Sequence, residues 1–564
     1  MTHDHPHDHP HVESDEPQLD AVSRRHLLQG IGAVGAGLAL TPAMGGSAAA
    51  APKGRPGPPA RGDVPGKPYL YLAGDHHVHT KYSVDAIYEV SQHAQKASRY
   101  GLDWMVVTDH GNTFHQKFSI DDTAEDIAAQ READPDLLVF QGLEWNIPGG
   151  EHATVFVAPG GKDIETLKRF ELDFDGAVLG ERANGGTGFL NRATENTDKA
   201  EQLAYAGLRY LAAQRRSGAI ADALMIANHV SRRGLDSPHE LRGYRDAADG
   251  IGIGMEGAPG HQAAGIPRAQ GGIAANRGFY GNPRNADSFD GYAPERYFTY
   301  GGFDYNVTQV GGLWDSMLAE GLPFTITSTS DAHFVHLERF RRGGTPAERQ
   351  VVPQYVTKGQ YLPPVEDQLP LAQGDFWPGQ YSSTLVAATD RSYTAIMEGL
   401  RKARVYAVHG RLVDAVDLRV DATGSGGAKG VTVGERTVAR RGSNIDVTIE
   451  ITLPAGPNFN GDVPVLAHVD LIAGPVTGPA AHPDALTAPA TRVVETFAVK
   501  QAPGNKVKLK YRFRNVQDSF YLRLRGSDGR QLDKAGNPMV DVRGDADPWV
   551  DLWFYSNPVF VDVV

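Results

Sequence analysis

The chain has 564 residues, 41% of them hydrophobic, and a formal net charge of -13, so it is long enough for two or three globular domains. The excess of 68 acidic over 55 basic residues argues against nonspecific nucleic-acid binding, which depends on Lys and Arg neutralising phosphates. No nucleic-acid partner is therefore expected. The chain has no cysteine, which excludes disulfides, zinc–thiolate sites and thiol catalysis.

Residues 1–51 are predicted to be an export signal with a histidine-rich leader. The sequence SRRHLLQG at 23–30 places twin arginines before a short apolar run, and small residues at 48–51 offer a cleavage site. The pattern resembles a bacterial twin-arginine signal. Its apolar run is shorter than the roughly 20 residues that a stable membrane span needs. We therefore expect export by the twin-arginine machinery and a secreted protein, extracellular or associated with the periplasm or cell wall.

Residues 52–67 are rich in Pro, Gly and Arg and are predicted to be a linker. From 68 to about 412, short apolar runs alternate with helical segments such as 86–100 and 200–216. This alternation predicts an α/β domain with a parallel sheet or barrel. The predicted strands lie in the segments YLAGDHHVH, WMVVTDH, LLVFQGLEWN, HATVFVAP, ALMIANHV, GIGMEG and FTITSTSDAH.

Three long insertions interrupt the predicted barrel, at 164–197, 257–312 and 334–389. Segments of this length inside a compact domain are either lids and binding loops or disordered, and both interpretations stay open here. The second insertion is rich in Gly, Tyr and Phe and carries Arg268 and Arg277.

The pattern changes near residue 413, after a predicted helix at 391–403. Segments such as NIDVTIEITL, VKLKYRFRN and FYLRLRGSDG alternate apolar and polar residues with a period of two, which is typical of half-buried antiparallel strands. Residues 413–564 are therefore predicted to form a β-sandwich-like domain. No cluster of histidines or carboxylates recurs in it, so a structural role is expected.

Ionisable residues stand at or near the ends of six of the seven predicted strands. In a barrel, the carboxyl ends of the strands meet at one face, so these side chains are expected to converge. Imidazole and carboxylate suit Zn, Mn and Fe, and nine such groups exceed the three or four that one ion takes from a protein. Two or three divalent ions are therefore expected. The candidate ligands are His77, His79, Asp85, His110, Glu144, His152, His229, Asp331 and His333.

The motifs HVHT, TDHG, GLEW, EHATVFV, ANH and SDAH, in this order over residues 69–333, resemble the PHP (polymerase and histidinol phosphatase) family of metallohydrolases. The resemblance implies a distorted (β/α)7 barrel. Two departures are SVDA in place of the usual small residue and Gly after the first motif, and His-Val in place of His-Pro at the fifth strand. The resemblance also implies three ions. His77, His79, Glu144 and Asp331 would hold the first, and Glu144 would bridge it to a second ion on His152 and His229. Asp85, His110 and His333 would hold the third.

The implied chemistry is metal-assisted hydrolysis of a small-molecule ester, in which a metal-activated hydroxide attacks and phosphate esters are favoured. Candidate catalytic residues are His229, Asp109 and Arg232, with Asp109 expected to orient a ligand histidine or a loop. Candidate substrate contacts are Arg268, Arg277 and His261. For the two loop arginines, a solvated surface charge is the competing interpretation.

Two further functions stay open. The barrel with a β-rich tail and a Ser-Asn-Pro motif resembles the carbaryl-hydrolase-like branch of the family, which cleaves a carbamate ester, and carboxylic esters are a related possibility. The aromatic residues Phe279, Tyr280, Tyr292 and Tyr297 would suit an apolar pocket for such a substrate. The other alternative is a noncatalytic protein that binds a surface or carbohydrate. Metal analysis distinguishes this noncatalytic protein from the hydrolases, because a noncatalytic barrel would bind less than one equivalent of metal.

Overall fold

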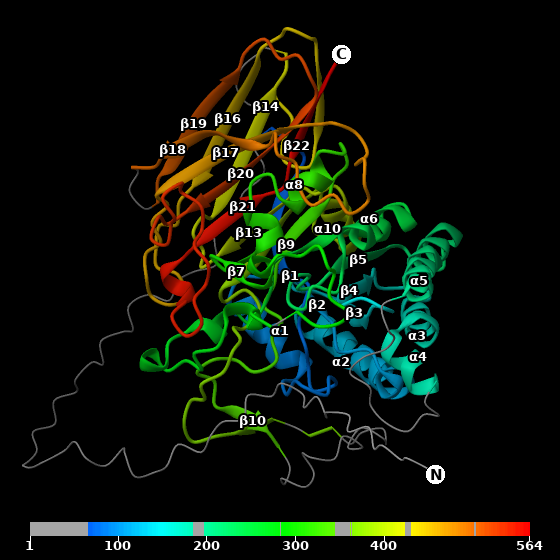
Figure 1. Ribbon diagram of the computed structural model, residues 1–564. Coiled ribbons are helices and arrows are strands. Elements are labelled where there is room, and N and C mark those ends of the chain that lie inside the picture. The colour runs from blue at the N-terminus through cyan, green and yellow to red at the C-terminus, as the bar shows by residue number, and fades with distance from the viewer. Residues whose placement is uncertain are drawn as a thin grey trace, which may run out of the picture. The chain divides into compact units, whose positions relative to one another are not determined.

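The computed structural model describes residues 66–183, 197–282, 284–343, 361–362, 364–423, 430–500 and 504–564 (Figure 1). The chain divides into two compact units, Met1–Arg55 and Pro56–Val564, and all described residues lie in the second. The predicted export signal, nearly all of the predicted linker and parts of all three insertions lie outside the described residues. Among the described helices, none is long and apolar enough to cross a membrane.

Seven consecutive strands at one end of a large sheet correspond to the seven apolar runs of the sequence. They pair in the order β1-β2-β3-β4-β5-β6-β9 and are buried along nearly their whole length, as expected for strands covered on both faces. The predicted α/β class is confirmed. The bounds are β1 Leu70–Asp75, β2 Trp104–Val107, β3 Leu138–Asn146, β4 His152–Val157, β5 Ala223–Ala227, β6 Gly252–Ala258 and β9 Thr325–Ser328.

Strand β4 departs from the expected parallel arrangement. The strands β1, β2 and β3 are parallel to one another, as are β5, β6 and β9, but β4 is antiparallel to both of its neighbours. Residues 147–151 are too few for a crossover connection, so β3 and β4 form a hairpin. His152 therefore stands at the start of its strand, opposite Asn146 at the end of β3. The reversal still places His152 at the edge where the other strands end.

The sheet curls so that its last parallel strand lies beside β12 (Ser382–Ala388), but no backbone ladder joins these two strands among the described residues. Side chains make the connection instead. The backbone N–H of Ser328 donates to Thr384 Oγ1 over 2.9 Å, and Thr384 Oγ1 donates to the Ser328 carbonyl over 2.8 Å. These bonds bring the end of β9 close to the first strand of the barrel, because β12 pairs with β1.

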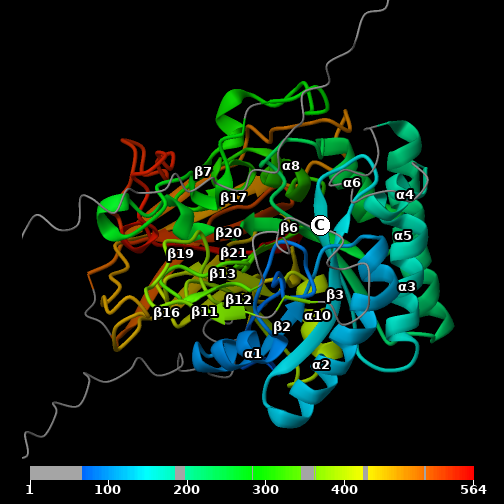
Figure 2. The ribbon, with the colours of Figure 1, turned by 90° about the horizontal axis from the view of Figure 1, so that it is seen from below.

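Helices cover the flanks of this sheet, and α3, α4 and α5 lie together on one side of it (Figure 2). Helix α5 begins where Thr197 accepts a hydrogen bond from the Ala200 N–H and ends at Gly218, whose φ is 74°. Helix α1 begins later than predicted because Glu89 caps it. The helices are α1 Val90–Arg99, α2 Ile120–Ala133, α3 Asp163–Phe174, α4 Gly176–Ala183, α5 Asp198–Ser217, α6 Pro238–Ala247, α7 Tyr305–Thr308, α8 Leu313–Leu318 and α10 Tyr393–Arg401.

The described part of the second insertion is packed against the sheet. Tyr280 and Tyr292 are buried, and their hydroxyls donate to Asp304 Oδ2 and to the Asp236 carbonyl. These two tyrosines therefore belong to the core. The short element η1 His115–Ser119 precedes α2. Short elements in the insertions are η2 Gln262–Gly265, η3 Arg268–Gln270, η4 Arg277–Phe279, η5 Pro294–Tyr297, β7 Thr299–Tyr300, β8 Phe303–Asp304, β10 Phe340–Arg342 and β11 Pro364–Glu366.

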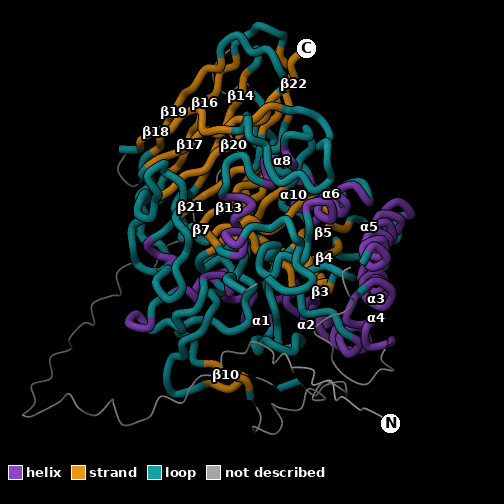
Figure 3. Tube along the Cα trace, in the orientation of Figure 1, coloured by secondary structure: helices purple, strands orange, loops and turns teal. Residues whose placement is uncertain are grey.

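The C-terminal strands are mostly antiparallel, as predicted, and form the upper part of the molecule in Figure 3. Side chains of β16 alternate between buried and half-buried positions, which matches the period of two in NIDVTIEITL. Strand β13 (Val405–His409) pairs with β21, so the sheet is continuous across the predicted boundary at 413. The other elements are β14 Ala415–Asp421, β15 Arg436–Ala439, β16 Ile445–Thr452, β17 His468–Pro475, β18 Arg492–Ala498, β19 Lys506–Phe513, β20 Phe520–Ser527, η7 Pro548–Val550, β21 Trp553–Ser556 and β22 Val559–Val563.

Asn557, in the Ser-Asn-Pro motif near the C-terminus, connects the tail to the barrel. Its buried side chain accepts from the Ile326 N–H over 2.9 Å and donates to the carbonyls of Ile326 and Val405 over 3.0 and 3.1 Å. The Asn557 amide thus supplies hydrogen bonds to the edge of β9 that pairs with no other strand among the described residues.

We expect Asn557→Ala to lower the free energy of unfolding by about 1–3 kcal/mol, because it leaves the buried Ile326 N–H without its partner and removes a donor from the carbonyls of Ile326 and Val405. Urea denaturation followed by circular dichroism measures this loss. Asn460→Ala, at an exposed turn, is the control and is expected to change stability by less than about 0.5 kcal/mol. Equal effects of the two substitutions would contradict the assigned role of Asn557.

Candidate metal centre

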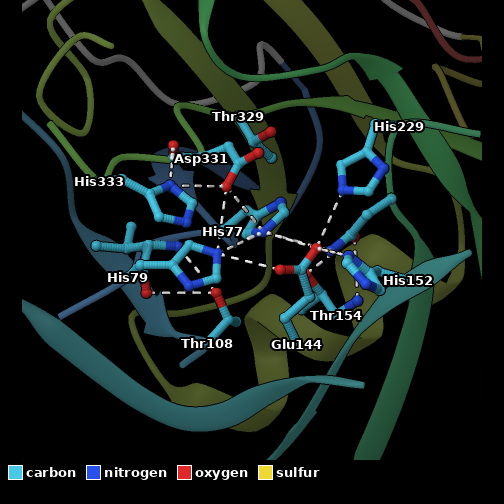
Figure 4. Close-up of polar contacts among 12 residues, drawn as sticks. His77, His79, Thr108, Glu144, His152, Thr154, His229, Thr329, Asp331 and His333 are labelled. Carbon is cyan, nitrogen blue, oxygen red and sulfur yellow. Dashed lines mark hydrogen bonds and ion pairs between the residues drawn. The ribbon is translucent and has the colours of Figure 1, made fainter. Parts of the chain in front are cut away.

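Histidines and carboxylates from six strands converge at one edge of the sheet (Figure 4). His77 and His79 follow β1, and Asp331 follows β9. The two segments are tied together, since the His79 N–H donates to the Ala332 carbonyl over 3.2 Å. All three side chains are buried. The predicted convergence of His77, His79 and Asp331 is therefore present in the structure.

The first group of atoms is compact enough to hold one ion. His77 Nε2 and His79 Nε2 are 3.0 Å apart, and each lies 3.2 Å from Asp331 Oδ1. Each also lies 3.2 Å from an oxygen of Glu144. Separations of 3.0–3.2 Å among His77 Nε2, His79 Nε2 and Asp331 Oδ1 leave room for an ion about 2.0 Å from each atom, which is the usual Zn–N and Zn–O distance.

Asp331 Oδ1 provides a second test of the fit. This oxygen is buried and accepts no hydrogen bond from the described residues. A buried carboxylate oxygen without a donor costs free energy unless a cation faces it. The residues present therefore fit a divalent cation.

Glu144 lies at the middle of the cluster. Its Oε1 is 3.1 Å from both His152 Nδ1 and His229 Nε2, and its Oε2 is 3.1 Å from His110 Nδ1. With His77 and His79, five histidines face this one carboxylate (Figure 4). Carboxylates commonly bridge adjacent ions, and the position of Glu144 is suited to that role.

A further group of ligands lies toward solvent. Asp85 Oδ2 is 3.0 Å from His110 Nε2 and 3.5 Å from His333 Nε2. The Asp85 side chain is 42% exposed, whereas those of His77 and His79 are fully buried. The mouth of the cluster is therefore on the side of Asp85. All nine predicted ligands belong to groups of side-chain atoms that lie close enough together to hold a metal ion.

Opposing charges within the cluster shift its pKa values strongly. Burial alone would raise the pKa of Glu144, but the imidazoles of His77, His152 and His110 hold it well below its usual range. Burial alone would lower the pKa of His77, but nearby carboxylates raise it well above its usual value. Burial and the charge of Arg232 lower the pKa of His229 to about 4, so that imidazole is neutral, as a metal ligand must be. The carboxylates thus require positive charge, which cations would supply.

Glu256 belongs to the site but was missed in the sequence. Its Oε1 accepts from His77 Nδ1 over 2.7 Å, and its Oε2 accepts from the backbone N–H of His229 over 2.8 Å. Such a carboxylate fixes the ring orientation of a ligand histidine. The available signal was a lone carboxylate in the otherwise apolar strand GIGMEGA.

Two predicted catalytic residues lie beside the cluster. Asp109 accepts from the Thr80 N–H over 2.6 Å and from Thr80 Oγ1 over 2.8 Å, so it holds the segment that follows His79. Arg232 Nη2 lies 3.2 Å from Glu151 Oε1, and its side chain is 15% exposed. Arg232 is therefore partly exposed beside Glu151, whereas Asp109 is a buried support.

The three predicted substrate contacts differ in position. Arg277 is fully buried, and its guanidinium donates to Asp541, Asp551, Tyr381 and Gln262. We therefore correct its assignment to packing of the insertion against the C-terminal segment. Arg268 is exposed on η3, and no hydrogen bond or ion pair joins it to the cluster in the described part of the chain. His261 contacts Asp331 directly, with 2.8 Å between Nε2 and Oδ2.

Asp175, near the cluster, is expected to make stability depend on pH. Burial and the nearby Glu171 raise the pKa of Asp175 to about 7. Between pH 4 and 7 the folded state therefore holds a proton that the unfolded state releases, and the contribution of Asp175 to stability falls as the pH rises. The difference in unfolding free energy between the wild type and Asp175→Asn should decrease from pH 4 to 7 and then level off, as measured by urea denaturation. An increase over this range would contradict the assignment.

Comparison with known proteins identifies one domain. Two solved structures are similar: a two-domain protein containing a predicted PHP-like metal-dependent phosphoesterase from Bacteroides vulgatus (13% identity, TM-score 0.33, 90% of this chain and 99% of that one), and a candidate metal-dependent phosphoesterase from Bifidobacterium adolescentis (15%, 0.23, 46% and 87%). No curated protein matches this chain. Residues 75–203 match the family profile of the PHP domain, and the chain therefore contains a PHP domain that includes the candidate ligands from His77 to His152.

Proposed function

We propose that this chain is a metal-dependent hydrolase that cleaves phosphate esters at a centre of two or three divalent ions such as Zn, Mn or Fe. The observation that carries the proposal is the position of Glu144, whose carboxylate lies 3.1–3.2 Å from nitrogens of five histidines on four separate segments. The PHP domain at 75–203 supports a hydrolase of this class.

The residues divide the work as follows. Divalent ions, when bound, would lower the pKa of a water molecule and neutralise charge on the oxygens of the ester. His77, His79 and Asp331 would hold an ion at the buried end, and Asp85, His110 and His333 would hold one nearer the mouth. His152 and His229 would hold another, and Glu144, which contacts five of the histidines, would supply a carboxylate to the neighbouring ions.

Arg232 is the residue best placed to contact an anionic substrate. Its partly exposed side chain lies beside Glu151, three residues after His229 in the chain, and its Nε is a buried donor without a hydrogen-bond partner among the described residues. Guanidinium groups bind phosphate oxygens with charge-assisted hydrogen bonds. This chemistry favours a phosphate ester over an uncharged carbamate.

A hydrolysis panel tests the proposal. Metal-loaded protein is assayed on phosphomonoesters, phosphodiesters, carbamates and carboxylic esters, with bound metal quantified in parallel. We expect turnover of a phosphoester, and a kcat/KM lower by about 100-fold in Arg232→Gln, within the range for loss of a group that stabilises developing charge. Turnover of a carbamate alone would replace the phosphoesterase proposal, and less than one equivalent of metal would remove the hydrolase proposal altogether.

Removal of the metal is expected to lower stability as well as activity. A ligand that binds only the folded state stabilises it by about 4 kcal/mol when present at 1,000 times its Kd. We therefore expect treatment with a chelator to lower the Tm and abolish hydrolysis, and excess divalent metal to restore both. Calorimetry before and after chelation measures the shift. An unchanged Tm in protein shown to be metal-free would contradict the expectation that ions bound at this cluster stabilise the folded state.

We also propose export through the twin-arginine pathway, which rests on the sequence SRRHLLQG alone. Replacing Arg24 and Arg25 by Lys is expected to retain the protein in the cytoplasm. Fractionation of cells that express the two forms measures the result, and equal export of both would contradict the proposal.

A further inference from the structure

Asp375 lies where three segments meet behind the candidate metal centre. It is buried in the connection between β11 and β12. Its Oδ2 accepts from the backbone N–H groups of His333 and Phe334 over 2.6 and 2.7 Å, and its Oδ1 lies 2.6 Å from His261 Nδ1. Asp375 therefore holds both the segment that carries the candidate ligand His333 and the imidazole of His261.

The imidazole of His261 lies between two carboxylates. Its Nδ1 faces Asp375, and its Nε2 lies 2.8 Å from Asp331 Oδ2. Both ring nitrogens of His261 thus face a carboxylate, and the ring lies between Asp375 and the candidate ligand Asp331 as a support for it.

The two oxygens of Asp331 have different surroundings as a result. Oδ2 lies 2.8 Å from His261 Nε2, whereas Oδ1 has no hydrogen bond from any residue that the structure describes and lies 3.2 Å from the Nε2 atoms of His77 and His79. The turn that carries His261 is pressed closely against this aspartate, because a Cβ added at Gly260 would lie 2.1 Å from the Cβ of Asp331. The backbone of Asp331 is itself in the left-handed region, with a φ of 46°.

We propose that Asp375 and His261 are positioning residues that hold Asp331 with a single oxygen, Oδ1, directed at the metal centre. The inference rests on the metal centre proposed above. The line of contacts from Asp375 through His261 to Asp331 fixes a carboxylate ligand from behind, and loss of such support costs metal affinity about 10–100-fold. Asp375 lies more than 40 residues beyond the last predicted ligand, His333, and no motif marks it.

The experiment uses Co²⁺ as the probe, since binding and the visible absorption of the bound ion require no substrate. Asp375→Asn keeps the shape of the side chain and an oxygen for the backbone N–H groups of His333 and Phe334. It replaces the carboxylate oxygen that faces His261 Nδ1, so the contact that orients the His261 ring is weakened. We expect Co²⁺ affinity to fall about 10–100-fold and the absorption bands of the bound ion to shift.

Asp103→Asn is the matched control. Asp103 is also a buried aspartate that accepts from a backbone N–H, that of Ala73 over 2.8 Å, and pairs with a cation, Arg391. Asp103 precedes β2, whereas the candidate ligand His110 follows that strand. If Asp375→Asn does not fold, His261→Gln tests the same contacts from Asp375 through His261 to Asp331. This variant leaves the contacts of Asp375 with His333 and Phe334 in place.

The proposal is supported if Asp375→Asn or His261→Gln weakens Co²⁺ binding and shifts its spectrum while Asp103→Asn does neither. It is overturned if both variants bind Co²⁺ as the wild type does, if Asp103→Asn causes an equal loss, or if the wild type binds no Co²⁺. Failure of the proposed function looks different, since a wild type that binds Co²⁺ but hydrolyses no ester leaves the expected spectral shift unchanged.

Discussion

Glu144→Gln is expected to lose bound metal and to lower kcat/KM by more than about 100-fold, because loss of a group that contacts the ions should exceed the 10–100-fold cost of losing an outer support. The substitution removes the carboxylate that five histidines face. Without the negative charge of Glu144, the five imidazoles lose the carboxylate that would help them to hold a cation. Metal content by elemental analysis and steady-state kinetics on the phosphoester found in the panel measure the two losses.

Glu171→Gln is the control for this prediction. Glu171 is also a buried glutamate bound to a histidine, with 2.9 Å between Oε1 and His115 Nδ1, but it contacts none of the nine candidate ligands in the described structure. We expect this variant to keep its metal and to lose stability only. A Glu144→Gln protein with full metal content and wild-type activity would remove Glu144 from the centre.

Asp315→Asn is expected to lower the free energy of unfolding by about 3–5 kcal/mol, the usual cost of leaving one member of a buried ion pair without its partner. Asp315 in α8 binds Arg523 in β20 through two bonds, of 2.8 and 2.7 Å, and both side chains are fully buried. Arg523 also lies over the Trp314 ring, 4.4 Å from its centre. This pair connects the barrel to the C-terminal strands, so urea denaturation should show the loss as a lower midpoint.

A surface pair provides the comparison. Asp446→Asn removes the partner of the solvent-exposed Arg512 and is expected to lower the free energy of unfolding far less than Asp315→Asn does, because water screens the pair. The double variant Asp315→Leu with Arg523→Leu should recover part of the stability lost in Asp315→Asn, because it leaves no buried charge. If Asp315→Asn and Asp446→Asn are equally mild, the buried pair does not hold the two parts of the chain together.

The strands of the barrel could be predicted because each is a short apolar run that ends in polar residues. Their directions could not all be predicted, as β4 shows, since an apolar run has the same pattern in a parallel and in an antiparallel strand. The length of the 147–151 connection was the available signal for the β3–β4 hairpin. Helix α1 likewise begins at Val90 because Glu89 caps it, a detail that hydrophobic periodicity does not resolve.

The candidate ligands could be predicted because histidines beside carboxylates at strand ends form recognisable motifs. Glu256 and Asp375 could not, because each is a single carboxylate without a histidine neighbour in sequence. Arg277 was misjudged for the opposite reason. An arginine in a Gly-rich insertion looks exposed, whereas this one is buried against Asp541 and Asp551, more than 260 residues away.

The sequence by itself determined the chemistry available to this protein: imidazoles and carboxylates spaced for metal ions, no thiol, and apolar runs that must be buried as strands. Only the tertiary structure decided which oxygen of Asp331 faces the cluster, which carboxylates stand behind the ligands, and that Asn557 from the tail completes the edge of β9. The physical reason is that local sequence sets strand propensity and ligand type, whereas partners and orientations depend on contacts between residues far apart in the chain.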